Sequence, residues 1–292
     1  MRSEIRDLKL KMSYINHNGT FVPADSPVVT AQNRAFRYGD ALFETIRIAN
    51  YNPRFLKEHL QRLSTGMQIL KMEPAGELNE IFLEHAILEL AQKNNITSDG
   101  RVRLSVYRNE GGHYTPDNNR TSFLIEAVPL EDRNYVLNAK GYTVDLYTEF
   151  KKNQNALSSI KSANSGIYVL AGIFKTENRL DECLLLNDKH HIIEGISSNL
   201  FAVKNGVLYT PPVADGCVDG VMRRKIIGIA QANKMAVYEI SVMQHVLLGA
   251  DELFLTNTVH GIRWIVAYKQ KRYFNNTSKK LTEKLNELVM EA

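Results

Sequence analysis

The feature that most limits the fold of this chain is a change of pattern at a short polar segment near its middle. Before residues 129–135 (PLEDRNY), helix-like and strand-like periodicities alternate, whereas short strand-like runs dominate after it. The length of 292 residues also exceeds the usual size of one domain, about 100 to 150 residues. We therefore predict a polar extension over 1–12, in which either Met1 or Met12 can be the natural start, a small domain over 13–129, a linker over 130–136 and a large β-rich domain over 137–292.

The small domain is predicted to combine strands with two helices. Two apolar runs joined by Asn18-Gly19 predict a hairpin over residues 14–22. Pro53 is predicted to open a helix whose apolar stripe ends at Leu70, and a second helix is expected over residues 77–93. Alternation of polar and apolar residues predicts further strands at residues 101–107 and 121–128.

The large domain is predicted to consist mainly of short strands. Lys161 lies between an extended run and a helix-like pattern over residues 167–174. Residues 219–221 are predicted to form a loop that enters a helix ending near Lys234, and the loop glycine leaves backbone amides free at the helix N-terminus. Strands are predicted at residues 142–147, 183–186, 192–195, 199–203, 207–209 and 251–255, and a last amphipathic helix at residues 281–289.

Composition excludes several classes of protein. The 36 Lys and Arg residues are interleaved with 32 Asp and Glu residues, so no nucleic-acid footprint is indicated. No run of 18 apolar residues occurs and the N-terminus lacks a signal-peptide pattern, which predicts a soluble, cytoplasmic protein without a membrane partner. Cys183 and Cys217 form no CxxC motif and have no suitably spaced histidines, so neither a disulfide nor a metal site is expected.

Five chemically distinct features lie far apart in the sequence. They are Lys161, a glutamate after a strand (Glu194), an arginine beside an apolar stripe (Arg62), the helix opened by Gly220, and the polar turn at residues 256–258. An activated amine, an acid for a ring nitrogen, and amides, hydroxyls and a guanidinium for a phosphate are what pyridoxal phosphate requires. Each feature alone also has a structural explanation, and spacing by itself does not decide between them.

Two loops also carry residues suited to binding. Residues 108–116 contain Arg108, a Gly-Gly pair, a histidine and a tyrosine; such a loop can close over an anionic substrate or can be a solvated hairpin. The Gly39-Asp40 turn is flanked by aromatic residues, and a buried turn whose aromatics fill the core explains it most simply. Both loops therefore stay open to a structural or a functional interpretation.

Longer motifs occur in a fixed order over residues 13–270. They are residues 34–40 (RAFRYGD), 58–63 (EHLQRL), Lys161 with Asn164, 194–201 (EGISSNLF), 220–223 (GVMR), 250–253 (ADEL) and 256–258 (TNT). Together they resemble the class IV, or fold type IV, pyridoxal-phosphate aminotransferase family. The resemblance implies an α+β fold with a small N-terminal α/β domain and a larger C-terminal pseudo-barrel, with the cofactor in the crevice and a homodimer that completes the site.

The resemblance also implies roles for individual residues. Lys161 would form the internal aldimine and later shuttle the Cα proton, and Glu194 would pair with the pyridinium nitrogen. The phosphate would be held by Arg62, the backbone amides of Val221 and Met222, and Asn257 with Thr258. The substrate pocket would be lined by Tyr38, Phe43 and Glu44, with Arg108 as the candidate for the substrate carboxylate.

The subfamily is left open by conflicting resemblances. Asn164, residues 220–223 and residues 108–116 are more similar to aminodeoxychorismate lyases and D-amino acid aminotransferases, whereas Phe43-Glu44 and residues 209–212 fit branched-chain aminotransferases. Branched-chain enzymes keep a tyrosine where this chain has Ser165 and Gly166. Those enzymes also have small residues and a proline after the position of Thr258, whereas this chain has His260 and Arg263 there. These two side chains either alter the substrate pocket or pack against the protein without a role in it.

We therefore expect a pyridoxal-phosphate-dependent aminotransferase that moves an amino group from a branched-chain or D-amino acid to a 2-oxo acid. The alternative is a 4-amino-4-deoxychorismate lyase that releases pyruvate and 4-aminobenzoate. A third hypothesis is a cofactor-storing or regulatory relative without turnover. The sequence leaves the amino donor, the acceptor and the stereochemical preference open.

Overall fold

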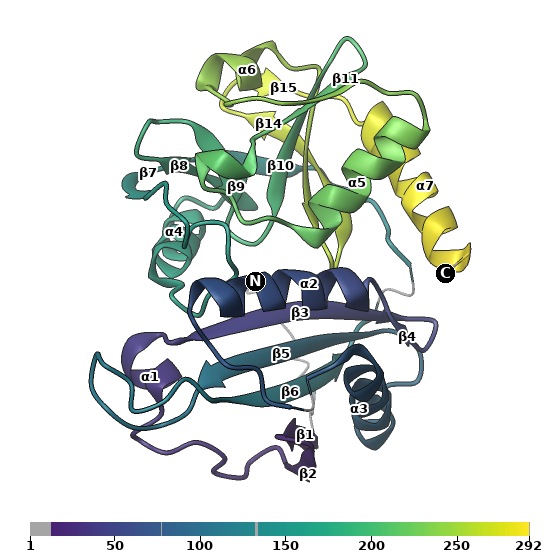
Figure 1. The fold of residues 1–292 in the computed structure, drawn as a ribbon. Coiled ribbons are helices and arrows are strands. Elements are labelled where there is room, and N and C mark those ends of the chain that lie inside the picture. The colour runs from purple at the N-terminus through teal and green to yellow at the C-terminus, as the bar shows by residue number, and fades with distance from the viewer. Residues whose placement is uncertain (1–12, 77, 132–133, 292) are drawn as a thin grey trace, which may run out of the picture.

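The computed structural model describes residues 13–76, 78–131 and 134–291, which form two bodies built on separate sheets (Figure 1). The predicted polar extension, with the choice between Met1 and Met12, lies outside the described residues. Part of the predicted linker, residues 132–133, lies outside them as well. No helix among the described residues is long and apolar enough to cross a membrane.

The first body contains a six-stranded antiparallel sheet with the strand order β2-β1-β6-β5-β3-β4. The Asn18-Gly19 turn predicted for the first hairpin has positive φ angles of 50° and 86°, as a tight hairpin turn requires. The strands are β1 (Tyr14–His17), β2 (Thr20–Pro23), β3 (Ala41–Ala49), β4 (Asn52–Pro53), β5 (Gly100–Arg108) and β6 (Thr121–Pro129), and the helices are α1 (Arg34–Tyr38), α2 (Leu56–Ile69) and α3 (Glu80–Lys93).

Successive side chains of β3 point alternately into the apolar core and toward a cavity. Leu42, Ile46 and Ile48 point into an apolar core that also contains residues of α2 and α3. Phe43 and Thr45 alternate with them and line a cavity between the two bodies. The first sheet therefore has one face covered by helices and one face that contributes to the cavity.

Two helix starts differ from the prediction. Pro53 does not open a helix; it pairs with Ile48 in the edge strand β4, a position where its missing N–H costs no ladder bond. Helix α2 starts at Leu56 after Phe55, which has a positive φ of 59°. Helix α3 starts at Glu80 because the side chain of Asn79 accepts a hydrogen bond from the backbone N–H of Phe82.

The second body is a barrel, as predicted, with additional strands at its edge. Six strands form a ring in the order β10-β13-β14-β7-β8-β9, and the pair Glu194↔Asn199 between β9 and β10 closes it. The strands are β7 (Tyr142–Lys152), β8 (Glu182–Asn187), β9 (Ile192–Gly195), β10 (Asn199–Lys204), β11 (Val207–Thr210), β12 (Val237–Glu239), β13 (Glu252–Asn257), β14 (Gly261–Tyr268) and β15 (Lys271–Arg272). The helices are α4 (Gly166–Glu177), α5 (Val221–Ala232), α6 (Gln244–Gly249) and α7 (Asn276–Glu291), with a 3-10 turn at Val213–Asp215.

Three apolar clusters fix the barrel and its helices. One cluster takes residues from all six ring strands and so fills the barrel interior. A second cluster joins the outer side of β10 and β13, through Phe201 and Phe254, to α5 and α7. A third packs α4 against β7, β8 and β9. Figure 1 shows α5 and α7 side by side on one flank and α4 on the other. These contacts hold the N-terminal ends of α4 and α5 toward the first sheet.

Buried polar contacts join the two bodies. Arg47 of β3 is 2% exposed, and its guanidinium donates to the carbonyl of Val259 at 2.5 Å and to Asp99 at 2.7 Å. The same guanidinium lies 4.6 Å from the ring centre of Tyr135, which belongs to the predicted linker and packs in the second body. The Thr258 hydroxyl donates to the carbonyl of Thr45 at 2.7 Å. The edge of β3 and the turn after β13 are therefore fixed to each other.

The Arg47→Met variant tests this connection. We expect the free energy of unfolding to fall by about 3 to 5 kcal/mol, because the buried Asp99 loses its cationic partner. Urea denaturation measures the change. Lys284→Met is the matched control, because it removes an exposed ion pair to Glu287 that contributes at most about 1 kcal/mol. Equal losses in the two variants would contradict the assigned importance of Arg47.

Candidate active site

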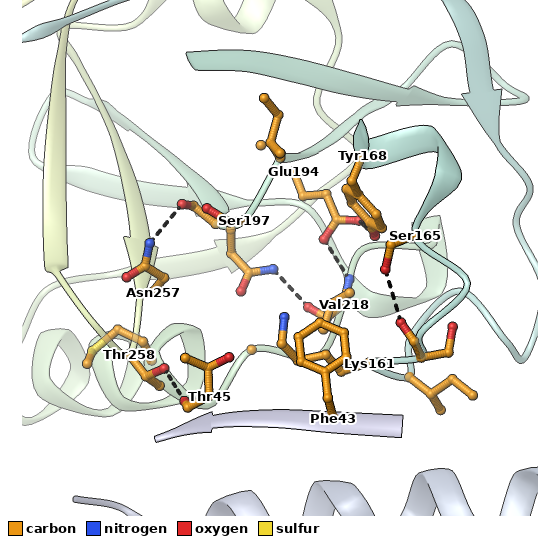
Figure 2. Close-up of a pocket in the computed structure, with 18 of the residues that line it drawn as sticks. Phe43, Thr45, Lys161, Ser165, Tyr168, Glu194, Ser197, Val218, Asn257 and Thr258 are labelled. Carbon is orange, nitrogen blue, oxygen red and sulfur yellow. Dashed lines mark hydrogen bonds between the residues drawn. The ribbon is translucent and has the colours of Figure 1, made fainter. Parts of the chain in front are cut away.

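A cavity of about 530 Å³ lies between the two bodies, and both contribute to its walls. This volume is in the range of small-molecule and cofactor sites. Lys161 lies at its centre with Phe43 beside it, whereas Glu194 and Tyr168 lie toward one end and Asn257 and Thr258 toward the other (Figure 2). The cavity therefore brings together residues that are as many as 217 positions apart in the chain, from Phe43 to His260.

Lys161 is placed by backbone pairing to the first sheet. It lies in the loop between β7 and α4, and its carbonyl accepts a hydrogen bond from the N–H of Phe43 at 3.0 Å. Its amine lies 4.5 Å from the ring centre of Phe43 and makes no hydrogen bond or ion pair within the described part of the chain. Burial, and then the nearby Arg62 guanidinium, lower the pKa of Lys161 to about 8. Lys161 is thus a partly buried, weakly solvated amine that lines the cavity.

The Glu194 carboxylate is held by three donors. The ammonium of Lys152 lies 2.7 Å and the hydroxyl of Tyr168 2.8 Å from Oε1, and the N–H of Val218 donates to Oε2 at 2.9 Å. Glu194 is 3% exposed, so its charge is compensated almost entirely by these neighbours. A carboxylate fixed in this way can accept a further hydrogen bond from a ring nitrogen.

The opposite end of the cavity is suited to an anion. Helix α5 begins at Val221 after Gly220, and no side chain caps its first backbone N–H groups. A Cβ atom at Gly220 would lie 1.8 Å from Oδ1 of Asn199, so only glycine fits. Thr256 also lines the cavity, and its buried hydroxyl has no hydrogen-bond partner among the described residues. Free amides and an unpaired hydroxyl are the donors that a phosphate needs.

Arg62 is held beside this helix terminus by a buried carboxylate. Its Nε and Nη2 donate to the two oxygens of Glu44 at 2.8 and 2.5 Å, and its Nη1 donates to the carbonyl of Asp219 at 2.9 Å. His59 Nδ1 lies 2.6 Å from the same carboxylate. Burial opposes the charge of Glu44, but Arg62 and His59 outweigh it and lower its pKa to about 2. The guanidinium therefore has little freedom to leave the cavity wall.

The turn after β13 is fixed on several sides. Oδ1 of Asn257 accepts hydrogen bonds from the N–H groups of Val259 and His260, and its Nδ2 donates to Ser198. The Thr258 carbonyl accepts from the hydroxyl of Tyr135 at 3.0 Å. His260 lies at the exposed rim of the cavity. The turn thus presents backbone and side-chain groups in fixed positions.

Most of the predicted site residues lie in the cavity, and three do not. Lys161, Arg62, Glu194, Val221, Met222, Asn257, Thr258, Phe43 and His260 line it. Glu44 follows Phe43 in a strand, so its side chain lies on the opposite face, where it is 1% exposed and pairs with Arg62. The prediction that Glu44 lines the pocket is therefore wrong; it contacts a residue that does.

Arg108 and Tyr38 line a neighbouring hollow, which shares wall residues such as Leu157 and Ser162 with the Lys161 cavity. All three nitrogens of the Arg108 guanidinium donate within the first body, to Asp40, to Asn119 and to the carbonyls of Leu70 and Lys71. Tyr38 lies with its ring centre 5.5 Å from that of Tyr114. Arg108 does not line the Lys161 cavity, and four of its five N–H donors are used within the first body, so its binding of a substrate carboxylate stays a prediction.

Two residues at the Glu194 end were missed from the sequence. Tyr168 is in the first turn of α4, seven residues after Lys161. Branched-chain enzymes keep a tyrosine where this chain has Ser165 and Gly166, and Tyr168 supplies a phenol near that position. Lys152 ends β7, which the alternation pattern predicted to stop at residue 147. A register shift between Tyr147 and Lys152 redirects the strand, and no sequence signal marks it.

Comparison with known proteins agrees with this geometry. Residues 41–268 match the model of the family described as amino-transferase class IV. The chain is 31% identical over 279 residues to the putative branched-chain-amino-acid aminotransferase of Methanocaldococcus jannaschii, covering 92% of this chain and 93% of that protein.

Solved structures are similar over nearly the whole chain. The branched-chain amino acid aminotransferase of Thermobaculum terrenum in its pyridoxal-phosphate form has a TM-score of 0.84 at 23% identity and covers 95% of this chain and 94% of its own. A putative 4-amino-4-deoxychorismate lyase of Legionella pneumophila has a TM-score of 0.81 at 25% identity and covers 90% of this chain and 96% of its own. The chain therefore belongs to the class IV aminotransferases, a family of pyridoxal-phosphate-dependent enzymes.

Proposed function

We propose that Lys161 binds pyridoxal phosphate and moves the Cα proton in the transfer of an amino group from an amino acid with a branched, apolar side chain to a 2-oxo acid. The observation that carries the proposal is the position of the Lys161 amine, which is largely withdrawn from solvent, unpaired within the described residues and in a cavity that Glu194 and the first residues of α5 also line. An amine in these surroundings is suited to attack a carbonyl carbon.

The residues around the cavity fit the cofactor. The uncapped N-terminus of α5, the unpaired Thr256 hydroxyl and the fixed Arg62 guanidinium would bind the phosphate. Val221 and Met222 would contribute their backbone amides, and the turn at Asn257-Thr258 would close this side. Glu194 would accept a hydrogen bond from the protonated ring nitrogen at the other end.

The chain's own groups then account for proton movement. When bound, pyridoxal phosphate withdraws electron density from the substrate Cα and so makes its proton removable. With a pKa of about 8, the Lys161 amine can accept that proton near neutral pH and can return it to another carbon. Phe43 packs beside the amine and excludes water from that side.

The apolar wall of the cavity supports a substrate with a branched, apolar side chain. Leu157, Ile160, Ile167, Ile196 and Val259 all line the cavity. They offer a carbon-rich surface on which such a side chain loses contact with water at little polar cost. The likeness to a putative branched-chain enzyme in M. jannaschii supports the same class of donor.

A homodimer is part of the proposal. Val169, Leu170 and Ile173 of α4 are exposed by 60%, 42% and 49%, and Leu157 at the cavity rim is exposed by 54%. An apolar surface of this kind next to a site is typical of a protein–protein interface. We infer that a second copy of the chain covers it and narrows the cavity entrance.

The Lys161→Ala variant tests the role of the lysine. Borohydride treatment of the wild-type protein should add the mass of the reduced cofactor to a peptide containing Lys161, and the variant should lose both this adduct and at least about 100-fold of the activity. Intact-protein and peptide mass spectrometry measure the adduct. Lys204→Ala changes an exposed lysine and should keep both properties. A full adduct on the Lys161→Ala variant would contradict the assignment.

The pKa of Lys161 can be measured by competitive acetylation of the cofactor-free chain. Reactivity of Lys161 should rise with a midpoint near pH 8, because burial and Arg62 disfavour its ammonium form, and exposed Lys204 serves as the reference lysine. Mass spectrometry of the labelled peptides over a pH series gives both midpoints. Coincident midpoints for the two lysines would exclude a desolvated Lys161.

A panel of substrates separates transamination from the lyase reaction. We expect formation of the keto acid from branched amino acids to require a 2-oxo acid acceptor. A lyase on the same fold, which the match to the L. pneumophila protein makes the competing function, would instead release pyruvate from 4-amino-4-deoxychorismate without an acceptor. Catalytic release of pyruvate under those conditions, together with inactivity toward every amino donor, would replace the transaminase proposal.

A further inference from the structure

A second lysine lies in the cavity and contacts the same glutamate. Lys152 ends β7, and its ammonium lies 2.7 Å from Oε1 of Glu194 and 2.8 Å from the carbonyl of Ser158. The side chains of Lys152 and Glu194 are 12% and 4% exposed. The ammonium also lies 5.4 Å from the ring centre of Tyr168. Lys152 is thus a buried cation whose bonds are directed at Glu194 and its surroundings.

The two lysines of the cavity have opposite environments. The amine of Lys161 has an aromatic ring beside it and no hydrogen bond or ion pair among the described residues. The ammonium of Lys152 instead donates to a carboxylate and to a carbonyl. An ammonium bound in this way has no free electron pair, so Lys152 is not a second nucleophile. Its function must therefore lie in its effect on Glu194.

We propose that Lys152 is a positioning residue that neutralises and orients Glu194, so that the carboxylate serves the cofactor ring instead of pairing with Lys161. The proposal rests on the proposed function, because it assigns Glu194 to the ring nitrogen. Tyr168 assists by donating its hydroxyl to the same oxygen, Oε1.

The hydrogen bonds divide the two carboxylate oxygens between different tasks. Oε1 accepts from both Lys152 and Tyr168, whereas Oε2 accepts from the N–H of Val218. Burial and then the charge of Glu194 raise the pKa of Tyr168, so its phenol stays protonated and donates. With Oε1 occupied, the remaining acceptor capacity lies mainly on Oε2. The carboxylate therefore cannot rotate freely without losing two hydrogen bonds.

Charge balance explains why this restraint matters for Lys161. The groups that act on its amine are Arg62 of α2 and Arg103 of β5, which lower its pKa, and Glu44 of β3 and Glu194 of β9, which raise it. Lys152 of β7 and Tyr168 of α4 contact Glu194 from the other side. Without the Lys152 cation, the uncompensated charge of Glu194 would favour an ammonium at Lys161 and an ion pair between them.

The test compares Lys152→Met with Lys152→Arg in the full-length chain. Lys152→Met keeps a long side chain but removes the charge, and we expect the dissociation constant for pyridoxal phosphate to rise about tenfold or more, as for the loss of a hydrogen bond to a charged group. In the cofactor-free chain, the acetylation midpoint of Lys161 should move to higher pH. Lys152→Arg keeps the cation and should retain most of the affinity and the wild-type midpoint.

Lys204→Met is the matched control, because Lys204 forms an ion pair with Asp251 at 2.8 Å but on the exposed surface. It should change neither the affinity nor the midpoint. Unchanged affinity and an unchanged Lys161 midpoint in Lys152→Met would overturn the inference. If Lys152→Met does not fold, Tyr168→Phe decides: it removes one donor to Oε1 and should still weaken binding of the cofactor, and unaltered binding would count against the role of this network.

These outcomes differ from those expected if the proposed function itself fails. A wild-type chain that forms no reducible attachment of pyridoxal phosphate to Lys161 would refute the proposed function. A wild-type chain that binds the cofactor through Lys161, combined with a Lys152→Met variant that behaves identically, would refute the role of Lys152 alone.

Discussion

The antiparallel pair Glu194↔Asn199 closes the barrel and also sets the position of the site. Both side chains bind the same residue, since Glu194 accepts from the N–H of Val218 and Asn199 donates to its carbonyl at 2.8 Å. Asn199 also packs against Gly220, where a larger residue would clash, and α5 begins directly after it. One strand pair therefore fixes the two ends of the cavity, the carboxylate and the helix N-terminus. A shift in barrel register would displace both together.

The first body contributes by covering the cavity from the other side. Arg62 of α2 reaches across to the carbonyl of Asp219, just before Gly220, while Arg47 and Thr45 of β3 hold the turn after β13. These contacts use buried polar groups that are expensive to leave unpaired. The relative position of the two bodies is thus specified by directed hydrogen bonds, and apolar contacts of Ala49 and Ile160 with the core of the opposite body add to them.

The fold and most residues of the Lys161 cavity wall were predictable from the sequence, because strand patterns, the glycine before a helix and collinear motifs carry that information locally. What failed depended on side-chain direction. Phe43 and Glu44 are adjacent in a strand, so both cannot face one cavity, and period-two alternation alone would have excluded Glu44. Arg108 is chemically able to bind a carboxylate, but its partners Asp40 and Asn119 come from distant turns that only the folded chain brings near it.

Each buried carboxylate of the site forms an ion pair with a cationic side chain other than Lys161. This pairing leaves the Lys161 amine as the reactive group. Glu44 is paired with Arg62 and Glu194 with Lys152, so the two buried acids each have a cation. Lys161 is left without an acid of its own, and burial then disfavours its ammonium. The free amine is therefore a consequence of how its neighbours are paired. A ligand that adds negative charge at the N-terminus of α5 would enter a site whose carboxylates are already neutralised.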